Sequence, residues 1–446
     1  MLSSETISCL SVDDKINERR TYTKESKVVR KIDIHLIPII SIFCLLSSLD
    51  RVNMGNARVA GLQKDLKLTD NQYQICITVL YVTYIASDLP ASLLLRKIGP
   101  NILMPTILIL WGLVTALQEC LLVSRMSLFS SIASLSGAFS GFLAAAIEKM
   151  DGINGRPGWA WIFILEGTFT ALVGISGYFL IPASIDNMKF LTEAERSLAN
   201  ERIITDRPSI QISEKFSFKQ VMISITSPHV IMTLCIGFFF GSVAYGLAFF
   251  LPTIISELGF SATHTQLLSV APSATGFVYT NLVSYLSDKY QTRAIPICFC
   301  AIISAIGYII FLVSSSTSMS YGSLFLSVSG ISGLLPIFAT WVANNSEPHS
   351  RRATSLALLF IAINSGGILS TWLFPSSEGP RFIRATIIYI TFSLSIFSLS
   401  VLNALYLKWR NRQKLSQKNS ISSGVDETSD SWLRLGDKHP EFIYTI

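Results

Sequence analysis

Long apolar stretches alternate with short polar connections from residue 34 to residue 407. A helix needs roughly 20 mostly apolar residues to cross the core of a bilayer, and in lipid it must satisfy its backbone hydrogen bonds internally. The pattern therefore predicts an all-α protein that crosses a membrane many times. We predict eleven spans, at residues 34–50, 73–95, 102–118, 128–147, 161–182, 229–251, 266–287, 295–313, 321–343, 353–374 and 383–407.

A polar segment divides these spans into two groups. Its basic and acidic side chains nearly balance, and Thr192 followed by Glu193 and Glu195 indicates the start of a short helix. The last part of the chain begins basic and becomes Ser-rich and acidic, so we expect it to be disordered. The predicted order is a tail (1–33), a first bundle (34–182), a linker (183–228), a second bundle (229–407) and a second tail (408–446).

The distribution of Lys and Arg in short loops predicts the orientation. The loops with Lys289, Arg293 and Arg351 lie on the side of the basic tail, whereas loops 252–265 and 314–320 contain neither residue type. The linker and both termini are therefore expected in the cytosol.

This orientation requires an even number of spans in the first bundle, and only five are present. The third span must end outside near Gln118, and the span that starts near Leu128 must begin inside. Residues 119–127 would have to cross between them. Nine residues of helix cover about 14 Å, against a core of roughly 30 Å. The sequence thus predicts that one span is missing.

Asp50 and Arg51 end the first span, and Asn53 lies near the same helical face as Asp50. A charge at membrane depth costs about 2.5–3.5 kcal/mol on insertion scales, and an adjacent Asp and Arg partly neutralise each other. One interpretation makes Asp50 a proton acceptor and Arg51 an anchor for an anionic substrate. The other is a polar helix end that extends into the outer headgroups.

Two more carboxylates lie within predicted spans. Asp88 precedes Pro90, which removes a backbone hydrogen bond, so Asp88 is a candidate gate residue that could pair with Arg96. Solvation toward the interface is the alternative. Glu166 lies among apolar residues, where a structural hydrogen bond and a role in transport are both compatible with the pattern.

The polar residues within the second bundle are neutral, which suits a cavity that binds a polar ligand between two halves. For each residue alone, ordinary interhelical hydrogen bonding, worth about 0.6 kcal/mol on average, is the alternative. The candidates for binding are Tyr245, Asn344, Asn345 and Asn364.

Composition supports the membrane assignment. Only 14% of the residues are charged, against about 25% in soluble domains. The net charge of +6 lies largely in the predicted cytosolic segments, and no basic block is interleaved with aromatics, so we expect no nucleic-acid partner. We find no catalytic or metal-ligating constellation in the sequence and no phosphate-binding Gly-Lys-Ser/Thr motif. We therefore expect neither an enzyme nor a cofactor.

The chain resembles the major facilitator superfamily in its two groups of spans, its central linker and the basic turns 94–100 and 284–293. A finer resemblance is to the fungal allantoate-permease branch of the anion:cation symporters. It rests on the stretches 49–57, 158–167, 250–255, 341–345 and 362–367.

The resemblance implies a two-bundle fold in which the halves rock around a midplane site and move a small organic anion, such as nicotinate or allantoate, together with protons. It also implies a plasma-membrane location, and we expect a monomer. By analogy, Asp50 couples protons and Arg51 binds the anion. The residues that match the family's cytosolic gate motif are Arg96, Gly99, Asp288 and Arg293.

The family has twelve spans, and its fourth normally carries a basic and an acidic residue facing the cavity. This sequence has about 11, and the fourth is the one that it lacks. Three functions therefore stay open: proton-coupled import, export of a secondary metabolite, and a truncated remnant or nutrient sensor that does not transport.

Sequencing of full-length transcripts between the codons for Gln118 and Leu128 tests the missing span. We expect a further apolar segment of about 20 residues with its loops, because the direction of the later spans requires another crossing. Transcripts that match the present chain would instead mean that a cavity-lining helix is absent, and we would then expect little or no transport.

Overall fold

The structure, a computed structural model, describes residues 53–98, 100–116, 157–182, 190–206, 218–420 and 435–446 continuously, and parts of 27–49, 143–153 and 185–188. Helices are the only regular secondary structure among these residues, as the apolar pattern predicts. Asp50, Arg51 and Gly99 lie outside the described residues, and so do the side chains of Asp88 and Arg96.

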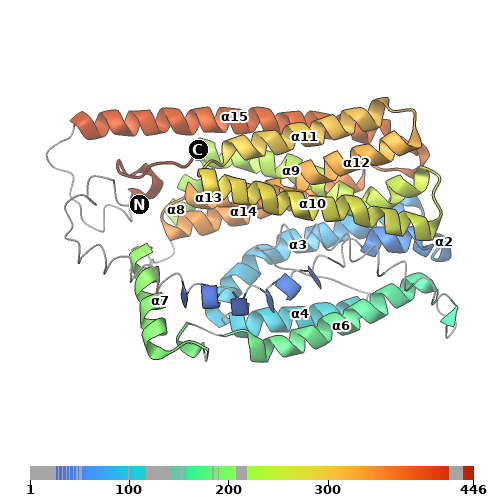
Figure 1. Cartoon of the computed structure of the whole chain (residues 1–446), viewed down its shortest axis with the longest axis horizontal. Helices are drawn as coiled ribbons and strands as arrows, with labels where there is room; N and C mark the ends of the chain where they lie inside the picture. Colours follow the sequence, from blue (N-terminus) through green and yellow to red (C-terminus); the bar gives the residue numbers. More distant parts are fainter. Residues whose placement is uncertain are drawn as a thin grey trace.

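The first part of the chain contains α2 (Leu62–Asp65), α3 (Asp70–Ile98), α4 (Pro100–Ala116) and α6 (Gly158–Leu180). The linker contains the short helices α7 (Glu193–Asp206) and α8 (Phe218–Ile225). The C-terminal bundle consists of α9 (Pro228–Glu257), α10 (Ala262–Tyr290), α11 (Ala294–Val313), α12 (Thr317–Ser332), α13 (Leu334–Asn344), α14 (His349–Thr371) and α15 (Ile383–Ser420) (Figure 1).

Six of the described helical segments are long and apolar enough to cross a membrane: α6, α9, α11, α12 with α13, α14, and α15. Large apolar side chains lie on their outer surfaces, among them Phe179, which is 86% exposed, and Ile295, which is 70% exposed. Apolar surface of this extent is typical of contact with lipid rather than with water.

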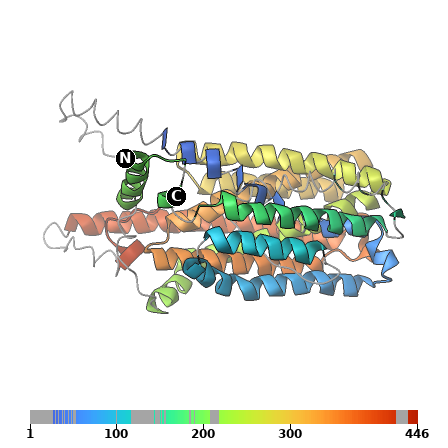
Figure 2. The same cartoon turned by 90° about the horizontal axis from the view of Figure 1, so that it is seen from below.

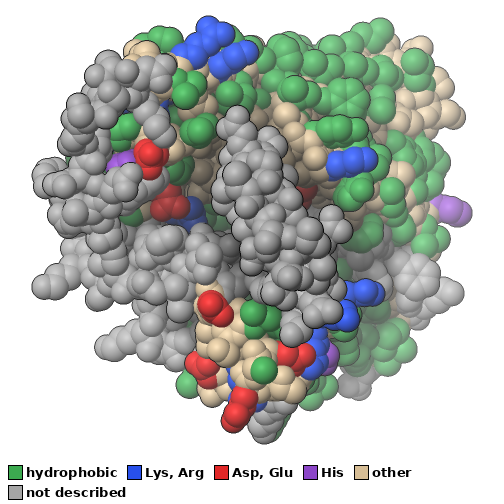
Figure 3. Space-filling view, turned by 60° about the vertical axis from the view of Figure 1, so that its left-hand side comes forward, with side chains coloured by type: hydrophobic (Ala, Val, Ile, Leu, Met, Phe, Trp, Pro, Cys, Tyr) green, Lys and Arg blue, Asp and Glu red, His purple; other side chains and the backbone are tan. Residues whose placement is uncertain are grey.

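The two ends of the molecule differ. The linker helix α7 and the last residues of the chain lie at one end, which we call the linker end, and α2 lies at the other, which we call the α2 end (Figures 1 and 2). The helices run lengthwise between these ends. Figure 3 looks toward the linker end and shows charged side chains gathered on α7.

The sequence correctly predicts the start of α7. The backbone N–H of Thr192 donates to Glu195 Oε2 over 2.8 Å, and the N–H of Glu195 donates to Thr192 Oγ1 over 3.4 Å, which forms a capping box. Lys31 Nζ lies 2.9 Å from the same carboxylate, so α7 is attached to the helical residues around Lys31. The hydrogen bond from Thr192, with that from Lys31, lowers the pKa of Glu195.

Helices α4 and α6 pack closely and run in opposite directions. A Cβ atom on Gly174 would contact Ile109, and one on Gly177 would contact Pro105. The later residue of α6 thus lies beside the earlier residue of α4, which makes the two helices antiparallel. Trp159, at the start of α6, donates its indole N–H to Asp65 in α2. Helix α6 therefore begins at the α2 end, and α4 runs toward that end.

The described residues before α6 also lie near the α2 end. Ile147 packs against Ile162 in the first turns of α6, with Met150 and Trp161 beside them. The chain thus heads for the α2 end along α4 and is near that end again at Ile147. The segment 119–127, where the sequence predicts a missing crossing, lies outside the described residues.

The expectation of a disordered tail after residue 408 is wrong for two stretches. Helix α15 continues to Ser420, and residues 435–446 pack against the bundle. The cause is that polar groups of the tail bind one another: Asn411 Nδ2 donates to the carbonyl oxygen of Tyr444 over 2.9 Å, and the N–H of Tyr444 donates to Asn411 Oδ1 over 2.9 Å.

Glycines set the spacing between α9 and α14, which pack along much of their length. A Cβ on Gly241 would overlap the carbonyl oxygen of Ile363, and a Cβ on Gly366 would overlap that of Phe238. Both backbones therefore approach more closely than any other residue type permits, which is the usual role of small residues between membrane helices.

We expect Gly366→Ala to destabilise the protein by about 1–3 kcal/mol, because the added methyl group forces two backbones apart. Thermal unfolding of the purified protein in detergent measures the effect. Gly322→Ala in α12 is the matched control, because nothing lies within 4 Å of the added atom and alanine favours the helix. Equal shifts for the two variants would contradict this account of the α9–α14 contact.

Candidate functional site

The helical residues 53–59, which we call the first helix, meet α3 and α9 around one buried cation at the α2 end. The Arg58 side chain is only 8% exposed. Its Nε donates to Gln63 Oε1 over 2.8 Å, and its Nη2 donates to Asp70 Oδ1 over 3.2 Å. Its guanidinium lies 4.7 Å from the ring centre of Tyr73 and 5.7 Å from that of Phe250. We call these five residues the Arg58 cluster.

The Arg58 cluster joins the two halves of the molecule. Phe250 belongs to α9 in the C-terminal bundle, and the other four members belong to the N-terminal half. Nearby, a Cβ on Gly55 would overlap the carbonyl oxygen of Phe249, so the first helix lies directly against α9. Cation–π contacts that are shielded from water are worth up to about 2 kcal/mol. The contact holds the halves together at the α2 end.

A second contact between the halves lies farther along α3. The hydroxyl of Tyr245 in α9 donates to Asn364 Oδ1 in α14 over 3.0 Å. The ring of Tyr81 in α3 lies 4.9 Å from that of Tyr245 and 6.0 Å from that of Phe249. We call Tyr81, Tyr245 and Asn364 the tyrosine cluster.

Along the length of α3, the tyrosine cluster lies close to the middle of the bundle. At 1.5 Å per residue, Tyr81 lies about 16 Å from the start of α3, roughly half the thickness of a bilayer core. A Cβ on Gly367 would lie 2.6 Å from the Tyr81 ring, so glycine leaves room for the aromatic contact. Thr78 and Thr371, whose hydroxyl oxygens are 3.0 Å apart, connect the same helices closer to the α2 end.

Beyond Tyr81, the two halves diverge. Figure 1 shows α3 leaving the C-terminal bundle and approaching α4 toward the linker end. The hydrogen-bonded pair Thr78–Thr371 joins α3 to α14, and the ring contact of Tyr81 with Tyr245 joins α3 to α9; both lie at Tyr81 or nearer the α2 end.

The structure brings together two of the four binding candidates in the C-terminal bundle, Tyr245 and Asn364. Asn344 and Asn345 lie at the linker end, where Asn344 is exposed and Asn345 is buried and hydrogen-bonded to the backbone of Thr445. Asn53 is 1% exposed in the first helix. It lies near Gly55 in the sequence, on the helix that packs against α9.

The remaining candidates are distributed over the bundle. Glu166 is 2% exposed in α6, a helix that packs chiefly against α4. Arg293 Nη1 donates to Asp288 Oδ1 over 2.6 Å and to Ser287 Oγ over 2.9 Å, so two of the residues that match the gate motif form an ion pair in the turn between α10 and α11. This turn lies at the linker end.

Sequence reasoning missed Tyr81, Tyr73 and the role of Arg58. Tyr73, Ile77 and Tyr81 recur every four residues and form the buried face of α3. This periodicity was available, but an aromatic residue in an apolar helix is equally typical of a lipid-facing position. For Arg58, the sequence does show a basic residue near a helix end and an acidic residue, Asp70, at the start of the following helix. These two residues could have been predicted to form an ion pair.

Comparisons with known proteins agree on one family. Residues 122–371 match a family model described as Major Facilitator Superfamily. An uncharacterized transporter of Schizosaccharomyces pombe is 30% identical, with 99% of this chain and 94% of the relative covered. The high-affinity nicotinic acid transporter of Saccharomyces cerevisiae is 27% identical, with 98% and 88% covered.

The alignment with the S. pombe relative runs over 483 positions, more than the 446 residues of this chain. The relative therefore contains residues that have no counterpart here.

Solved structures share the fold. A bacterial homologue of the human lysosomal transporter Spinster superposes with a TM-score of 0.58 at 13% identity, covering 82% of this chain and 96% of that one. A D-xylose–proton symporter superposes with a TM-score of 0.54 at 14% identity, covering 82% and 97%.

We expect Arg58→Lys to lower the unfolding temperature, because a lysine cannot bind Gln63 and Asp70 and lie over Tyr73 at once. The loss should be about 1–2 kcal/mol, the value of one or two hydrogen bonds to a charged group. Lys64→Arg, an exposed exchange of the same pair of residue types in α2, is the control. If both variants unfold at the temperature of the native protein, the Arg58 cluster does not stabilise the contact between the halves.

Proposed function

The chain belongs to the Major Facilitator Superfamily and is a membrane transporter of that kind, and we propose that it moves a small organic anion across the plasma membrane together with protons. The substrate class is supported by the nicotinic acid transporter among its relatives. We propose that the protein acts as a monomer, since one chain contains both halves of the fold.

The observation that carries the proposal is the tyrosine cluster. Tyr245 and Asn364 provide a hydroxyl and an amide at about the middle of the bundle, next to Tyr81 from the other half. Ligand sites in transporters of this fold lie at this depth, between the two halves. We propose that the ligand binds on the linker side of the tyrosine cluster, where Tyr245 and Asn364 contact its polar groups.

The charged partners in this proposal precede Asn53 in the sequence. We propose that Arg51 binds the carboxylate of the substrate and that Asp50 carries the coupled proton. A guanidinium offers two parallel N–H groups that match a carboxylate. A carboxyl group at membrane depth changes its protonation state readily, because burial disfavours the charged form.

We propose that the linker end faces the cytosol, because the short basic loops and the basic start of the tail belong to it. With this orientation, the Arg58 cluster closes the molecule on the outer side, and the structure represents a state that is open to the cytosol. Asp288 and Arg293 then belong to the cytosolic gate of the second half, and Asp88, Arg96 and Gly99 belong to that of the first.

We also propose that the chain lacks the fourth span of its family. Helix α4 runs toward the α2 end, and Ile147 lies near that end again. A single span between them, at 128–147, cannot return the chain to the same side. The residues of the S. pombe relative that have no counterpart here support the same proposal.

Uptake of labelled nicotinate by yeast cells that lack their own transporter tests the function. We expect uptake that rises with an inward proton gradient and is lost in Asp50→Asn, because an amide cannot carry the proton. Tyr245→Phe should weaken the apparent affinity about tenfold, since one hydrogen bond to a charged ligand is removed.

Tyr285→Phe is the matched control, because Tyr285 is 63% exposed on α10, and it should leave uptake unchanged. The same measurements are made on any longer chain that the transcripts encode. Uptake that is independent of the proton gradient in both chains, or unaffected by Asp50→Asn, would contradict the proposal. Accumulation only in cells without the protein would indicate export.

A further inference from the structure

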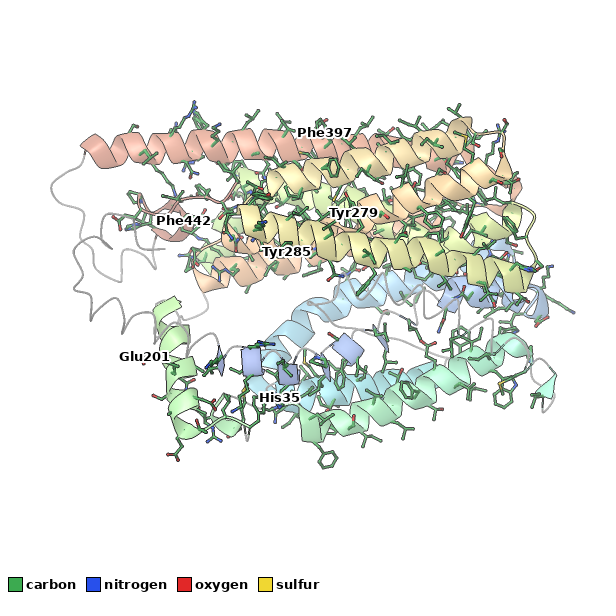
Figure 4. The ribbon with its side chains drawn as sticks, in the orientation of Figure 1. His35, Glu201, Tyr279, Tyr285, Phe397 and Phe442 are labelled. Atoms are coloured by element: carbon green, nitrogen blue, oxygen red, sulfur yellow. The ribbon has the colours of Figure 1, made fainter. Side chains whose placement is uncertain are left out.

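The last twelve residues, Leu435–Ile446, bind across the linker end of the C-terminal bundle (Figure 1). We call them the C-terminal segment. Phe442, labelled in Figure 4, lies beside α15. The sequence predicts neither this position nor any role for these residues, and the proposed function does not use them.

Backbone hydrogen bonds attach the C-terminal segment to two connections of the bundle. The N–H of Thr445 donates to Asn345 Oδ1 over 2.8 Å, and its carbonyl oxygen accepts from Asn345 Nδ2 and from Trp341 Nε1, both over 2.9 Å. The carbonyl oxygen of Ile446 accepts from the N–H of Arg293 over 2.9 Å. The segment thus reaches both the end of α13 and the turn between α10 and α11.

Buried charges attach the C-terminal segment to α14. Arg351 forms an ion pair with Asp437, and the two side chains are 3% and 13% exposed. The hydroxyl of Tyr444 donates to the other carboxylate oxygen of Asp437 over 3.2 Å. A buried ion pair that loses one partner leaves an uncompensated charge, which is strongly unfavourable. Separation of the segment from α14 therefore requires water to replace Asp437.

A lysine attaches the C-terminal segment to α15. Lys414 Nζ donates to the carbonyl oxygens of Asp437 and Phe442 over 2.6 Å and 2.8 Å, and lies 4.2 Å from the ring centre of Tyr444. Together with Asn411, which binds both backbone groups of Tyr444, it fixes the segment along one face of the helix.

Gly436 allows the C-terminal segment to start close to the bundle. Its φ of 55° lies in the left-handed region, and a Cβ there would overlap the carbonyl oxygen of Glu347. Glycine adopts this conformation without steric cost. The N–H of the next residue, Asp437, donates to that same carbonyl oxygen over 3.0 Å.

The helix held by the C-terminal segment is a half-helix with a break behind it. Helix α12 ends at Ser332 and α13 begins at Leu334, with Gly333 between them. Pro336 lacks an N–H and its ring excludes the carbonyl group four residues earlier, which explains the break. The body of α13 is packed in the core through Ile337 and Phe338, and its far end, at Trp341 and Asn345, is the part that the C-terminal segment binds.

We propose that the C-terminal segment is an intramolecular latch, which binds the far end of α13 and joins it to α14, α15 and the α10–α11 turn. While the latch is bound, it connects these elements at the linker end, and its release removes the hydrogen bonds that hold Trp341 and Asn345 at the far end of α13. The latch is independent of the substrate, so it can hold whether or not the chain transports.

Hydrogen exchange of the purified full chain, followed by mass spectrometry, tests the latch. Thr445→Pro removes the N–H that Asn345 binds, and Thr445→Val keeps that N–H and is the matched control. We expect Thr445→Pro to accelerate exchange about five- to tenfold in residues 437–446, the factor that one hydrogen bond provides. Residues 338–345 should accelerate with them, while α9 and α11 stay unchanged.

Gly436→Ala acts at the other end of the C-terminal segment and should give the same pattern. Faster exchange in the segment with an unchanged α13 would overturn the proposal, and so would unchanged exchange in both regions of both variants. Acceleration throughout the bundle would show that the segment is part of the core rather than a latch. In the native protein, exchange of residues 437–446 at the rate of the free peptide would exclude the docking itself.

Discussion

A chain inside a bilayer must satisfy every backbone hydrogen bond within the segment that crosses, and the rest of this structure depends on that constraint. It makes each crossing a complete helix, so the chain changes sides once per span. The directions of α4 and α6 then limit what can lie between them. Because α4 runs toward the α2 end and α6 starts from it, the number of crossings between them must be even.

Between its helices, the molecule uses two kinds of contact. Within the C-terminal bundle, glycines bring the backbones of α9 and α14 into contact. Between the halves, one glycine contact of this kind, Gly55 against the backbone of Phe249, is joined by side-chain contacts: Arg58 lies against Phe250, and Tyr81 lies against Tyr245.

The features that the sequence predicted well are those that depend on neighbouring residues. Apolar runs predicted the helices, and Thr192 with Glu195 predicted the start of α7, because helix formation and capping involve residues within about one turn. Tyr81 was missed because its partners, Tyr245 and Phe249, lie in another helix of the opposite half, and no local pattern specifies that neighbour.

The tail shows why composition alone gave the wrong answer there. A polar, Ser-rich segment cannot bury enough apolar surface to fold by itself, and that argument holds for an isolated chain. Here the bundle supplies groups that the segment lacks: Arg351 and Lys414 from two helices, and the amide of Asn345.

Asn345 illustrates the limit of reasoning from residue type. Its amide was a candidate for ligand binding because it offers one acceptor and two donors inside an apolar bundle. The backbone of Thr445 presents a complementary donor and acceptor, which bind the oxygen of the amide and one of its two N–H groups. A side chain suited to bind a polar ligand is equally suited to bind a peptide group, and only the position of the chain in space distinguishes the two uses.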